Sequence, residues 1–400
     1  MSKQFNWQLI NDSITKEDKK TLTDFINTDG VRFTNGEKVK EFERQWAEWV
    51  GTKYALYVNS GGSANLLLLD AVMEQYYKDD SNYIINRAPI VLAPSCTWGT
   101  TIAPLMQLGY DIRYCDIDTE TYSFCEEHME QIRDEVKAEG KLGLEIVWIT
   151  HLLGSPCNID KIKRVFPNAM ILEDCCESHG ATFKGQKVGT FGNGSTFSFY
   201  FGHHMTTIEG GMINTNDKDL YELMRMKRSH GLARETSPEV FDTIKKEHPE
   251  LDERFLFPTT GYNLRNQEIN AVLGIEQLKK LDEWIDIRKE NLHLFNKMLS
   301  KFEDQFHPVY EEGNSSYALA FVCKDREIKE KLEPHLASNG IETRPFLVGN
   351  ILRQPFIKHK NPESFTNAEF LHKNAFYIGN NQFIKREWFK ELEQLIRDII

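Results

Sequence analysis

The sequence has few cysteines, no long apolar run and no excess of basic residues, and each absence excludes a class of protein. Its seven cysteines are an odd number without any CxxC pair, so neither a disulfide scaffold nor a structural metal site is expected. No stretch of about 18 consecutive apolar residues occurs, and residues 1–7 lack the apolar core of a signal peptide. The formal net charge of -12 argues against a nucleic-acid-binding surface. We therefore expect a cytoplasmic protein that binds neither membranes nor nucleic acids.

What the sequence does contain is an alternation of short apolar strands and helices. Residues 37–50 place apolar side chains at positions 39, 42, 46, 49 and 50, a helical spacing that ends at Gly51. Strands are expected at 54–58, 89–93, 112–115, 145–150, 169–172 and 195–200, with helices at 66–73 and 100–108. This alternation predicts a mainly parallel sheet covered by helices on both faces.

The later segments predict a second, smaller domain. A long helix over 267–298 is followed by a strand at 317–323, a helix at 327–338, an extended piece at 341–347 and a C-terminal helix after Lys385. This mixture is typical of a small α+β domain. We therefore expect a large domain over 1–265, a bridging helix over 266–299 and a small domain over 300–400. The polar stretch 228–260 interrupts the pattern and is predicted to be a long functional excursion.

Two polar segments follow predicted strands, where a parallel sheet presents its carboxyl edge to ligands. The Gly/Ser turn at 59–65 leads into an apolar helix, and such a turn at a helix N-terminus suits phosphate. Asp174 follows the strand at 169–172. A buried Asp174 needs a cationic partner, such as a protonated pyridine nitrogen. A helix N-cap is the alternative role of this aspartate.

Three further residues fit an aromatic, phosphorylated cofactor, although each also has a simpler explanation. Ser198, at the end of a strand, could bind phosphate or be an ordinary strand residue. Trp98, just past another strand, could stack on an aromatic ring or pack in the core. Asn263 could donate its amide to phosphate or cap the helix that follows.

In their order along the chain, these residues resemble the sugar aminotransferase family (DegT/DnrJ/EryC1/StrS type) of fold-type I pyridoxal-phosphate enzymes. The resemblance extends from about residue 5 to the C-terminus, with matches at 60–65, 98, 173–174, 189–192, 198, 209–211 and 261–263. It implies an α/β, aspartate aminotransferase-like fold whose large domain has a mainly parallel seven-stranded sheet.

The same resemblance implies roles for individual residues. Gly62 and Ser63 would hold the cofactor phosphate with their backbone groups, and Ser198 would also bind it. Trp98 would stack on the ring, and Asp174 would bind the pyridine nitrogen. Asn263 would reach the phosphate of the neighbouring subunit, which implies a homodimer with shared active sites.

Position 203 carries the departure from this family that matters most. Counting five residues forward from Ser198 and six back from Glu209 leads both times to His203, where the family has its cofactor-binding lysine. Because histidine cannot form that covalent bond, the cofactor would be held by non-covalent contacts and could act as pyridoxamine phosphate. A free imidazole, with a pKa of about 6.5, is largely unprotonated at neutral pH and can serve as a base without further tuning. The family branch with histidine here is that of the nucleotide-sugar 3-dehydratases.

The resemblance to this branch implies the reactants. The run 343–355 is similar to the branch, and Arg344, Asn350 and Arg353 within it are expected to contact the substrate, with a salt bridge as the alternative for Arg344. The expected reaction removes the 3-hydroxyl of a nucleotide-linked 4-keto-6-deoxyhexose, with GDP-4-keto-6-deoxy-D-mannose as substrate and L-glutamate as amine donor. The context would be dideoxysugar (colitose) biosynthesis for lipopolysaccharide O-antigen.

One type of this branch uses a [2Fe-2S] cluster on four cysteines, the first of which aligns with Cys176. Because the next cysteine in the chain is Cys323, no iron–sulfur cluster is expected. Glu177 stands where many relatives have Gln or His beside the phenolic oxygen of the cofactor, and Phe201-Gly202 replaces a Pro-Ala pair. We expect Glu177 to contact the cofactor and to tune the protonation of its ring.

Two rival interpretations remain open. The chain could be a nucleotide-sugar 4-aminotransferase that recruits another lysine, Lys184 or Lys187, both in the hydrophilic run 183–188. It could also be a non-catalytic, cofactor-binding regulatory protein that has lost its lysine.

Overall fold

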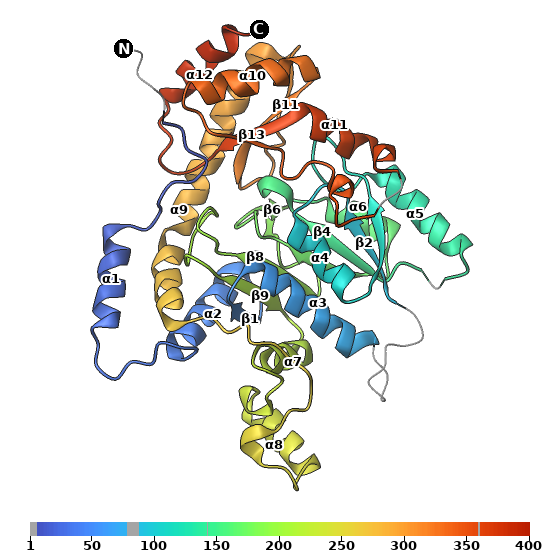
Figure 1. Ribbon diagram of the computed structural model, residues 1–400, viewed down its shortest axis with the longest axis vertical. Helices are drawn as coiled ribbons and strands as arrows, with labels where there is room; N and C mark the ends of the chain where they lie inside the picture. The colour runs from blue at the N-terminus through green and yellow to red at the C-terminus, as the bar shows by residue number, and fades with distance from the viewer. Residues whose placement is uncertain (1–5, 78–87, 142, 359–360) are drawn as a thin grey trace.

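The computed structural model describes residues 6–77, 88–141, 143–358 and 361–400, and its main feature is a seven-stranded sheet (Figure 1). The strands are β1 (Tyr54–Val58), β2 (Ile90–Pro94), β3 (Asp111–Cys115), β4 (Ile146–Thr150), β5 (Met170–Asp174), β8 (Gly194–Ser198) and β9 (Gly211–Thr215). Their order is β1-β9-β8-β5-β4-β2-β3. Only β9 runs antiparallel to its neighbours in this sheet. The predicted mainly parallel sheet is therefore confirmed.

Helices cover both faces of this sheet because successive strand residues point to opposite sides. Val91 and Trp148 belong to the apolar cluster that contains residues of α3 (Gly61–Tyr77), α4 (Gly99–Gln107) and α7 (Lys218–Arg228). Leu92 and Val147, their chain neighbours, pack with α5 (Glu126–Ala138) and α6 (Ile159–Val165). On that second face, Phe197 and Met212 also pack with α2 (Glu37–Val50) and α9 (Glu268–Leu299).

The 32-residue helix α9 leads from the large sheet to a smaller, antiparallel one (Figure 1). The four strands of the small sheet have the order β10-β11-β13-β12. Their bounds are β10 (Phe306–His307), β11 (Ala318–Cys323), β12 (Thr343–Pro345) and β13 (Ala375–Gly379). The helices α10 (Arg326–Ser338), α11 (Thr366–Asn374) and α12 (Trp388–Arg397) accompany it, whereas α1 (Lys16–Ile26) packs on α9. The smaller α+β part is confirmed, and the boundaries at 265 and 299 stay predictions.

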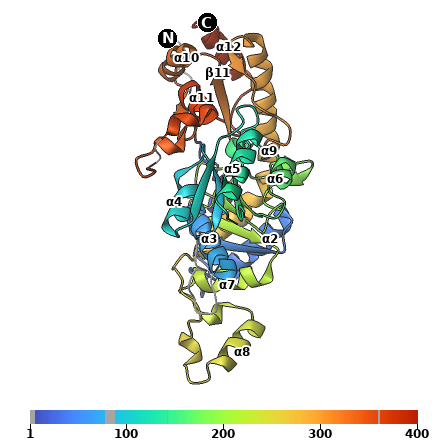
Figure 2. The ribbon, with the colours of Figure 1, turned by 90° about the vertical axis from the view of Figure 1, so that its right-hand side faces the viewer.

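The excursion after α7 is a folded projection at the end of the molecule opposite the chain termini (Figures 1 and 2). It contains α8 (Pro238–Glu247), none of whose residues is buried. Lys227 fixes its base, since Nζ of this fully buried lysine lies 2.8 Å from carboxylate oxygens of both Asp70 and Glu74 on α3. A hairpin of β6 (Thr182–Phe183) and β7 (Gln186–Lys187) completes the strands. Within the described residues, no helix is long and apolar enough to span a bilayer.

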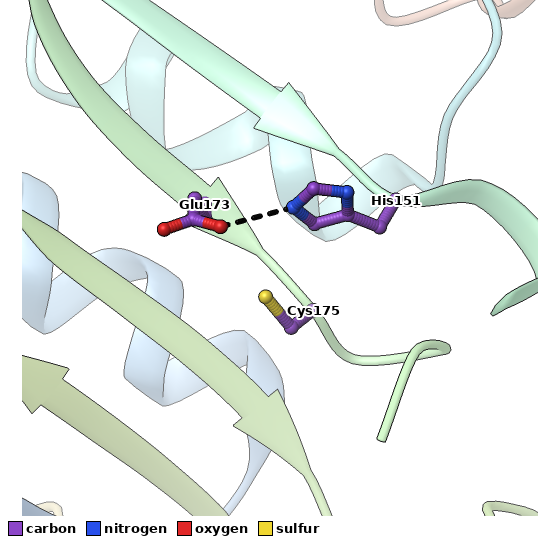
Figure 3. Close-up of side chains that lie close together, drawn as sticks. All are labelled: His151, Glu173 and Cys175. Carbon is purple, nitrogen blue, oxygen red and sulfur yellow. Dashed lines mark hydrogen bonds and ion pairs between the residues drawn. The ribbon is translucent and has the colours of Figure 1, made fainter. Parts of the chain in front are cut away.

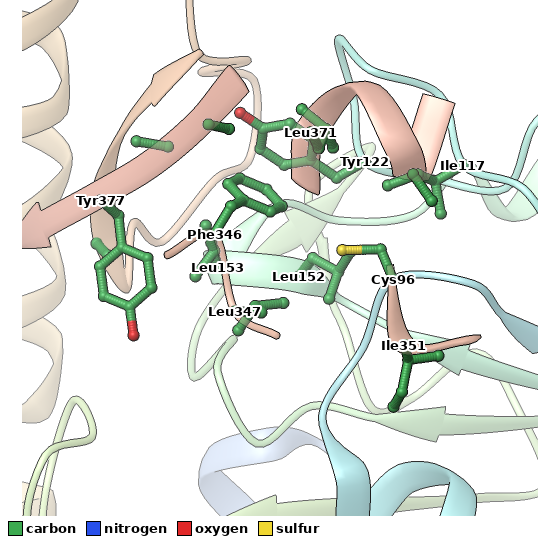
Figure 4. Packing of buried hydrophobic residues seen from close by; sticks show 14 of the residues in the cluster. Cys96, Ile117, Tyr122, Leu152, Leu153, Phe346, Leu347, Ile351, Leu371 and Tyr377 are labelled. Carbon is green, nitrogen blue, oxygen red and sulfur yellow. The ribbon is translucent and has the colours of Figure 1, made fainter. Parts of the chain in front are cut away.

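Apolar contacts hold the segment around β12 against the carboxyl edge of the large sheet (Figure 4). The Phe346 ring lies 5.0 Å from that of Tyr122, and Leu347 belongs to the same cluster as Leu152 and Leu153, which follow β4. This packing brings residues of the C-terminal part, distant in sequence, to the strand ends where the polar motifs lie.

Candidate active site

A cavity of about 420 Å³ lies where the carboxyl ends of β4, β5 and β8 meet the first turn of α3 and the small sheet. Several residues singled out from the sequence line this cavity: Gly62, Trp98, Asp174, Glu177, Ser198, His203 and Arg344. Residues separated by almost 300 positions in the chain thus form one site, at the sheet edge where open α/β folds bind ligands.

The first turn of α3 and Ser198 form the end of the cavity that suits an anion. A Cβ atom on Gly61 would lie 2.5 Å from Cβ of Ser198, so only glycine allows the helix to start this close to β8. The amide groups of a first helical turn have no partner within the helix and point toward a bound anion. Ser60 caps this turn, because its Oγ accepts a hydrogen bond from the amide of Ser63 (3.1 Å), and Ser63 is not among the residues that line the cavity.

Asp174 is buried at the end of β5 and keeps acceptor capacity for a ligand. Oδ2 accepts hydrogen bonds from Nδ2 of Asn65 (3.0 Å) and Oγ1 of Thr101 (2.7 Å), and Oδ1 accepts from the amide of Cys176 (3.1 Å). A carboxylate offers about four acceptor positions, so one remains. The N-cap alternative is wrong, because the residues that follow Asp174 form turns and not a helix.

Trp98, which precedes Asp174 in the sequence, and Glu177, which follows it, also line the cavity. The Trp98 side chain is 53% exposed, which excludes core packing. Oε2 of Glu177 accepts a hydrogen bond from the amide of Leu153 (3.0 Å). Burial raises the pKa of Glu177 to about 8, with a further contribution from the charge of Asp174, although the Leu153 amide opposes the rise. Glu177 is therefore largely a neutral acid at pH 7.

His203 lines the cavity, whereas His204 points into the protein. The His203 amide donates to the carbonyl of Tyr200 (3.0 Å) in a turn after β8, and its Nδ1 is buried without a partner among the described residues. Burial lowers the pKa of His203 to about 3, and the charge of Arg288 lowers it further. The imidazole is thus neutral at pH 7, and its pKa lies below the ordinary value of about 6.5 that was expected from the sequence. His204 is fully buried, and its Nε2 lies 3.1 Å from the carbonyl oxygen of Ser315.

No lysine is among the described residues that line the cavity. Lys184 forms an ion pair with Asp160 at the surface. The ammonium group of Lys187 lies 3.8 Å from the ring centre of Trp49. Neither lysine that a covalent attachment of the cofactor would require is therefore within the site.

Comparison with known proteins identifies the family that the sequence resembles. Residues 12–393 match the model of the DegT/DnrJ/EryC1/StrS aminotransferase family. The chain belongs to this family. It is 36% identical to a GDP-4-keto-6-deoxy-D-mannose 3-dehydratase of Escherichia coli O55:H7, over 92% of this chain and 93% of that one.

Solved structures agree with the sequence comparison. An Escherichia coli GDP-4-keto-6-deoxy-D-mannose 3-dehydratase with bound hydrated PLP superposes with a TM-score of 0.83 at 31% identity, covering 98% of this chain and all of that one. A GDP-4-keto-6-deoxymannose 3-dehydratase with a trapped PLP–glutamate geminal diamine has a TM-score of 0.82 at 30% identity, with 98% and 100% coverage. The expected family and fold are confirmed.

Besides Ser63, three residues expected at the site lie outside the cavity of this DegT/DnrJ/EryC1/StrS family member. Asn263 is exposed, and its Oδ1 accepts a hydrogen bond from Arg265 (3.1 Å). It does not cap α9, whose N-cap is Gln267. Oδ1 of buried Asn350 accepts from the amide of Leu352 (3.1 Å). Arg353 is also outside the cavity.

The partners of Asn350 and Arg353 explain why they do not face the cavity. Arg353 forms ion pairs with Glu369 (2.7 Å) and Glu363 (3.0 Å), and Asn350 donates to the carbonyl of Pro362 (2.9 Å). These bonds hold α11 against the preceding loop, so the geometry does not support the predicted substrate contacts. Arg344, by contrast, lines the cavity and forms no ion pair with a described carboxylate.

Sequence reasoning missed the small-sheet side of the cavity, where Tyr317 and Tyr377 contribute to the wall. The Tyr317 ring lies 5.4 Å from that of His203. Neither tyrosine belongs to a motif, and only the packing of the small sheet on the large one brings them to the site. Burial raises the pKa of Tyr377 to about 12, so its hydroxyl stays protonated at neutral pH.

Glu173, the neighbour of Asp174, points away from the cavity and holds a loop in place. Its carboxylate accepts hydrogen bonds from the backbone amides of Gly189 (2.7 Å), Phe191 (2.8 Å) and Gly192 (2.9 Å). It also lies 3.1 Å from Nε2 of His151 (Figure 3). The 189–192 motif thus serves as a set of amide donors for a buried carboxylate.

His151, Glu173 and Cys175 lie close enough to one another to suggest a metal site, with ligand atoms within 4.8 Å (Figure 3). However, the amide of Cys157 donates to Nδ1 of His151 (3.0 Å). Nδ1 is therefore the acceptor, so Nε2 carries the proton and donates it to Glu173. Because both imidazole nitrogens and the carboxylate are already paired, the cluster is a structural hydrogen-bond network.

Proposed function

We propose that this chain is a pyridoxal-phosphate-dependent nucleotide-sugar 3-dehydratase that removes the 3-hydroxyl of a 4-keto-6-deoxyhexose. One observation carries this proposal. A neutral His203 lies on the cavity wall at the position of the family lysine, and none of the described residues lining the cavity is a lysine. The site can thus move a proton at this position but cannot bind the cofactor covalently.

The described residues fit the cofactor. The first turn of α3 and Ser198 would hold its phosphate, and the free acceptor position of Asp174 would hold its protonated pyridine nitrogen. The exposed face of Trp98 would stack on the ring, and Glu177 would lie beside the phenolic oxygen. In its amine form the cofactor would supply the amino group that condenses with the 4-keto carbon and the electron sink that lets the 3-hydroxyl leave.

His203 would act as the base of the reaction. Its imidazole accepts a proton next to the cofactor ring, since burial keeps it unprotonated at neutral pH. The same low proton affinity lets it pass that proton on to the departing hydroxyl. The apolar packing around Phe346 and Leu347 closes one side of the site and limits the entry of water.

Arg344 would bind an anionic group of the reactants. It is an exposed cation at the cavity mouth without a carboxylate partner among the described residues, and a guanidinium binds carboxylate or phosphate through two parallel hydrogen bonds. The names of the similar enzymes favour GDP-4-keto-6-deoxy-D-mannose as substrate, and the trapped glutamate adduct favours L-glutamate as amine donor. Both are proposed for this chain.

A homodimer with shared sites is part of the proposal. Asn263 is exposed and lies outside the cavity of its own chain, at the base of the projecting excursion. A residue so placed can reach the phosphate end of a second subunit's cavity, as the resemblance implies.

The test is incubation of the protein with L-glutamate and GDP-4-keto-6-deoxymannose, with the product analysed by mass spectrometry. The expected product is a nucleotide sugar that has lost one oxygen atom. CDP-, dTDP- and UDP-linked 4-keto-6-deoxy sugars serve as matched controls for the nucleotide. A 4-amino sugar as the main product would support the aminotransferase alternative, and no conversion of any sugar would support the non-catalytic one. A phosphopyridoxyl-lysine after borohydride reduction would refute the proposal directly.

A further inference from the structure

His203 belongs to a cluster of three imidazoles, and the proposed reaction uses neither of the other two, His179 and His204. The His179 ring is 6.0 Å from that of His203 and 5.2 Å from that of His204. Both ring nitrogens of His179, and Nδ1 of each of the other two, are buried without a hydrogen-bond partner among the described residues. Buried polar atoms are nearly always paired, so this cluster lowers stability and calls for a functional explanation.

Aromatic rings separate His179 and His204 from water, whereas His203 also borders the cavity. Trp46, Phe197 and Phe199 surround His179, with ring centres 5.5 to 5.8 Å from its own. Tyr317 covers His203 and His204 at 5.4 and 6.1 Å. In such dry surroundings two like charges repel more strongly than in water, because the effective dielectric constant is lower.

Arg288 of α9 is linked to this cluster through Tyr317, because its guanidinium binds the backbone of the residue whose ring covers His203 and His204. Its side chain is 3% exposed and donates hydrogen bonds to the backbone carbonyls of Tyr317 (3.2 Å) and Asn380. In the described part of the chain it has no carboxylate partner, and its Nε has no partner at all. Arg228, which is equally buried, pairs with Glu43 at 2.6 Å. An uncompensated buried charge is costly, which indicates that the field of Arg288 is used.

We propose that Arg288 is a positioning residue for His203: its buried guanidinium, without a counter-charge, keeps the imidazole at position 203 in the neutral, proton-accepting form. This inference rests on the proposed function, in which His203 is the base. A proton on His203 would place a second cation in the dry cluster, so the field of Arg288 opposes it. The same field acts on His179 and His204, whose pKa values are lowered by burial and then by Arg288 and neighbouring histidines.

Other ionisable groups lie around His203, but the causes of its lowered pKa are burial and Arg288. These groups are Tyr200 and His204 on its own turn, His179 and Glu177 after β5, Tyr317 before β11, and Asp174, Glu209 and Arg344 on the cavity wall. Burial raises the pKa of Glu177 to about 8, so this acid is largely uncharged at pH 7. The pyridine nitrogen of the cofactor would neutralise Asp174.

A thiol at position 203 measures this field without any need for turnover. His203→Cys introduces a group with an ordinary pKa of about 8.5, which titrates within the stable range of most proteins. The rate of its alkylation by iodoacetamide is followed from pH 6 to pH 10, and mass spectrometry of the peptide distinguishes it from Cys176. The same titration is repeated after Arg288→Gln and Arg288→Lys in the His203→Cys background.

Arg288→Gln should raise the thiol pKa by about half a pH unit or more, because it removes a unit charge that favours the thiolate. Arg288→Lys keeps the charge and should restore most of the lower value. Arg228→Gln is the matched control: it removes a buried but paired guanidinium and should lower the melting temperature without shifting the thiol pKa. An unchanged thiol pKa after Arg288→Gln overturns the inference.

Wild-type protein supplies a second measurement if the Arg288→Gln variant does not fold. The ¹⁵N chemical shifts of histidine-labelled protein, with His203 assigned from the His203→Asn spectrum, should show a neutral imidazole at pH 6. A cationic His203 at that pH would overturn the inference. Neither measurement uses substrate, so the expected shifts in a protein that converts no nucleotide sugar would contradict the proposed function alone.

Discussion

His151 and His203 follow strands that end at the same edge of the large sheet, yet their surroundings differ completely. Both nitrogens of His151 are paired, one with the Cys157 amide and the other with Glu173. His203 faces a cavity, and its Nδ1 is buried without a described partner. A fully paired imidazole stabilises the fold, whereas an imidazole with unused nitrogens is available for chemistry.

The same contrast separates two adjacent carboxylates. Glu173 and Asp174 alternate in direction along β5, so one points behind the sheet edge and the other into the cavity. Glu173 is saturated by three backbone amides and His151. Asp174 keeps one acceptor position. The sheet edge therefore has two sides. We call the side of Glu173 and His151 the structural side, and the side of Asp174 and His203, which faces the cavity, the reactive side.

The largest expected effect is on the reactive side. His203→Asn should reduce the rate of sugar conversion by about 10²- to 10⁴-fold, the usual contribution of a general base. Because His203 is only half-buried, the variant should melt within a few degrees of the wild type. Steady-state kinetics and calorimetry check this pair of outcomes. A variant with nearly wild-type turnover would remove His203 from the mechanism.

On the structural side, Glu173→Gln should lower the free energy of unfolding by about 2–4 kcal/mol. The amide group would set an N–H donor against backbone amides that donate to this fully buried position. Urea denaturation checks the value. Residual folded protein should turn over at a rate close to that of the wild type; a specific loss of turnover with unchanged stability would place Glu173 on the reactive side.

Asn350→Ala tests the residues that lie outside the cavity, with a smaller effect. Loss of the hydrogen bonds to Leu352 and Pro362 should cost about 1–2 kcal/mol of stability. The KM for the nucleotide sugar should not change, whereas Arg344→Gln should raise it. A raised KM in Asn350→Ala, measured at a temperature where the variant is fully folded, would show that Asn350 contacts the substrate after all.

The last effect concerns the pH dependence of stability. Between the ordinary value of 4.5 and its folded pKa of about 8, Glu177 keeps a proton that the unfolded chain releases. Stability therefore falls as pH rises through this window. Glu177→Gln lacks this titration. The melting temperature of the variant minus that of the wild type should therefore increase by a few degrees between pH 5 and pH 8. A constant difference across this range would mean that Glu177 is ionised in the folded protein.

The sequence predicted the strands of the large sheet well where apolar runs end at turn residues, as at β1 and β5. It missed β9 and β13. β9 begins within the Glu209-Gly-Gly211 motif, and β13 continues from α11 without an intervening turn residue. The apolar pattern of such a short segment does not distinguish a strand from part of a helix.

Residues of the site were predictable when they belong to a motif on one strand end, as with Asp174, Ser198 and His203. The roles of Asn350 and Arg353 were not, because Glu363 and Glu369, which bind Arg353, become neighbours only through the fold of the 350–369 loop and α11. The positions of Arg288 and Tyr317 near the site could not be predicted for the same reason. Their contacts depend on how α9 and the small sheet pack on the large sheet, which no local spacing specifies.

The most direct test of the central claim is the amount of ammonia released per nucleotide sugar consumed, compared between the wild type and His203→Lys. With L-glutamate and GDP-4-keto-6-deoxymannose, the wild type should release one ammonia per sugar, because the amino group is lost when the deoxygenated product forms. His203→Lys should release little and should leave nitrogen on the sugar. A wild-type protein that forms an amino sugar without releasing ammonia would contradict the assignment of His203 as the base of a dehydratase.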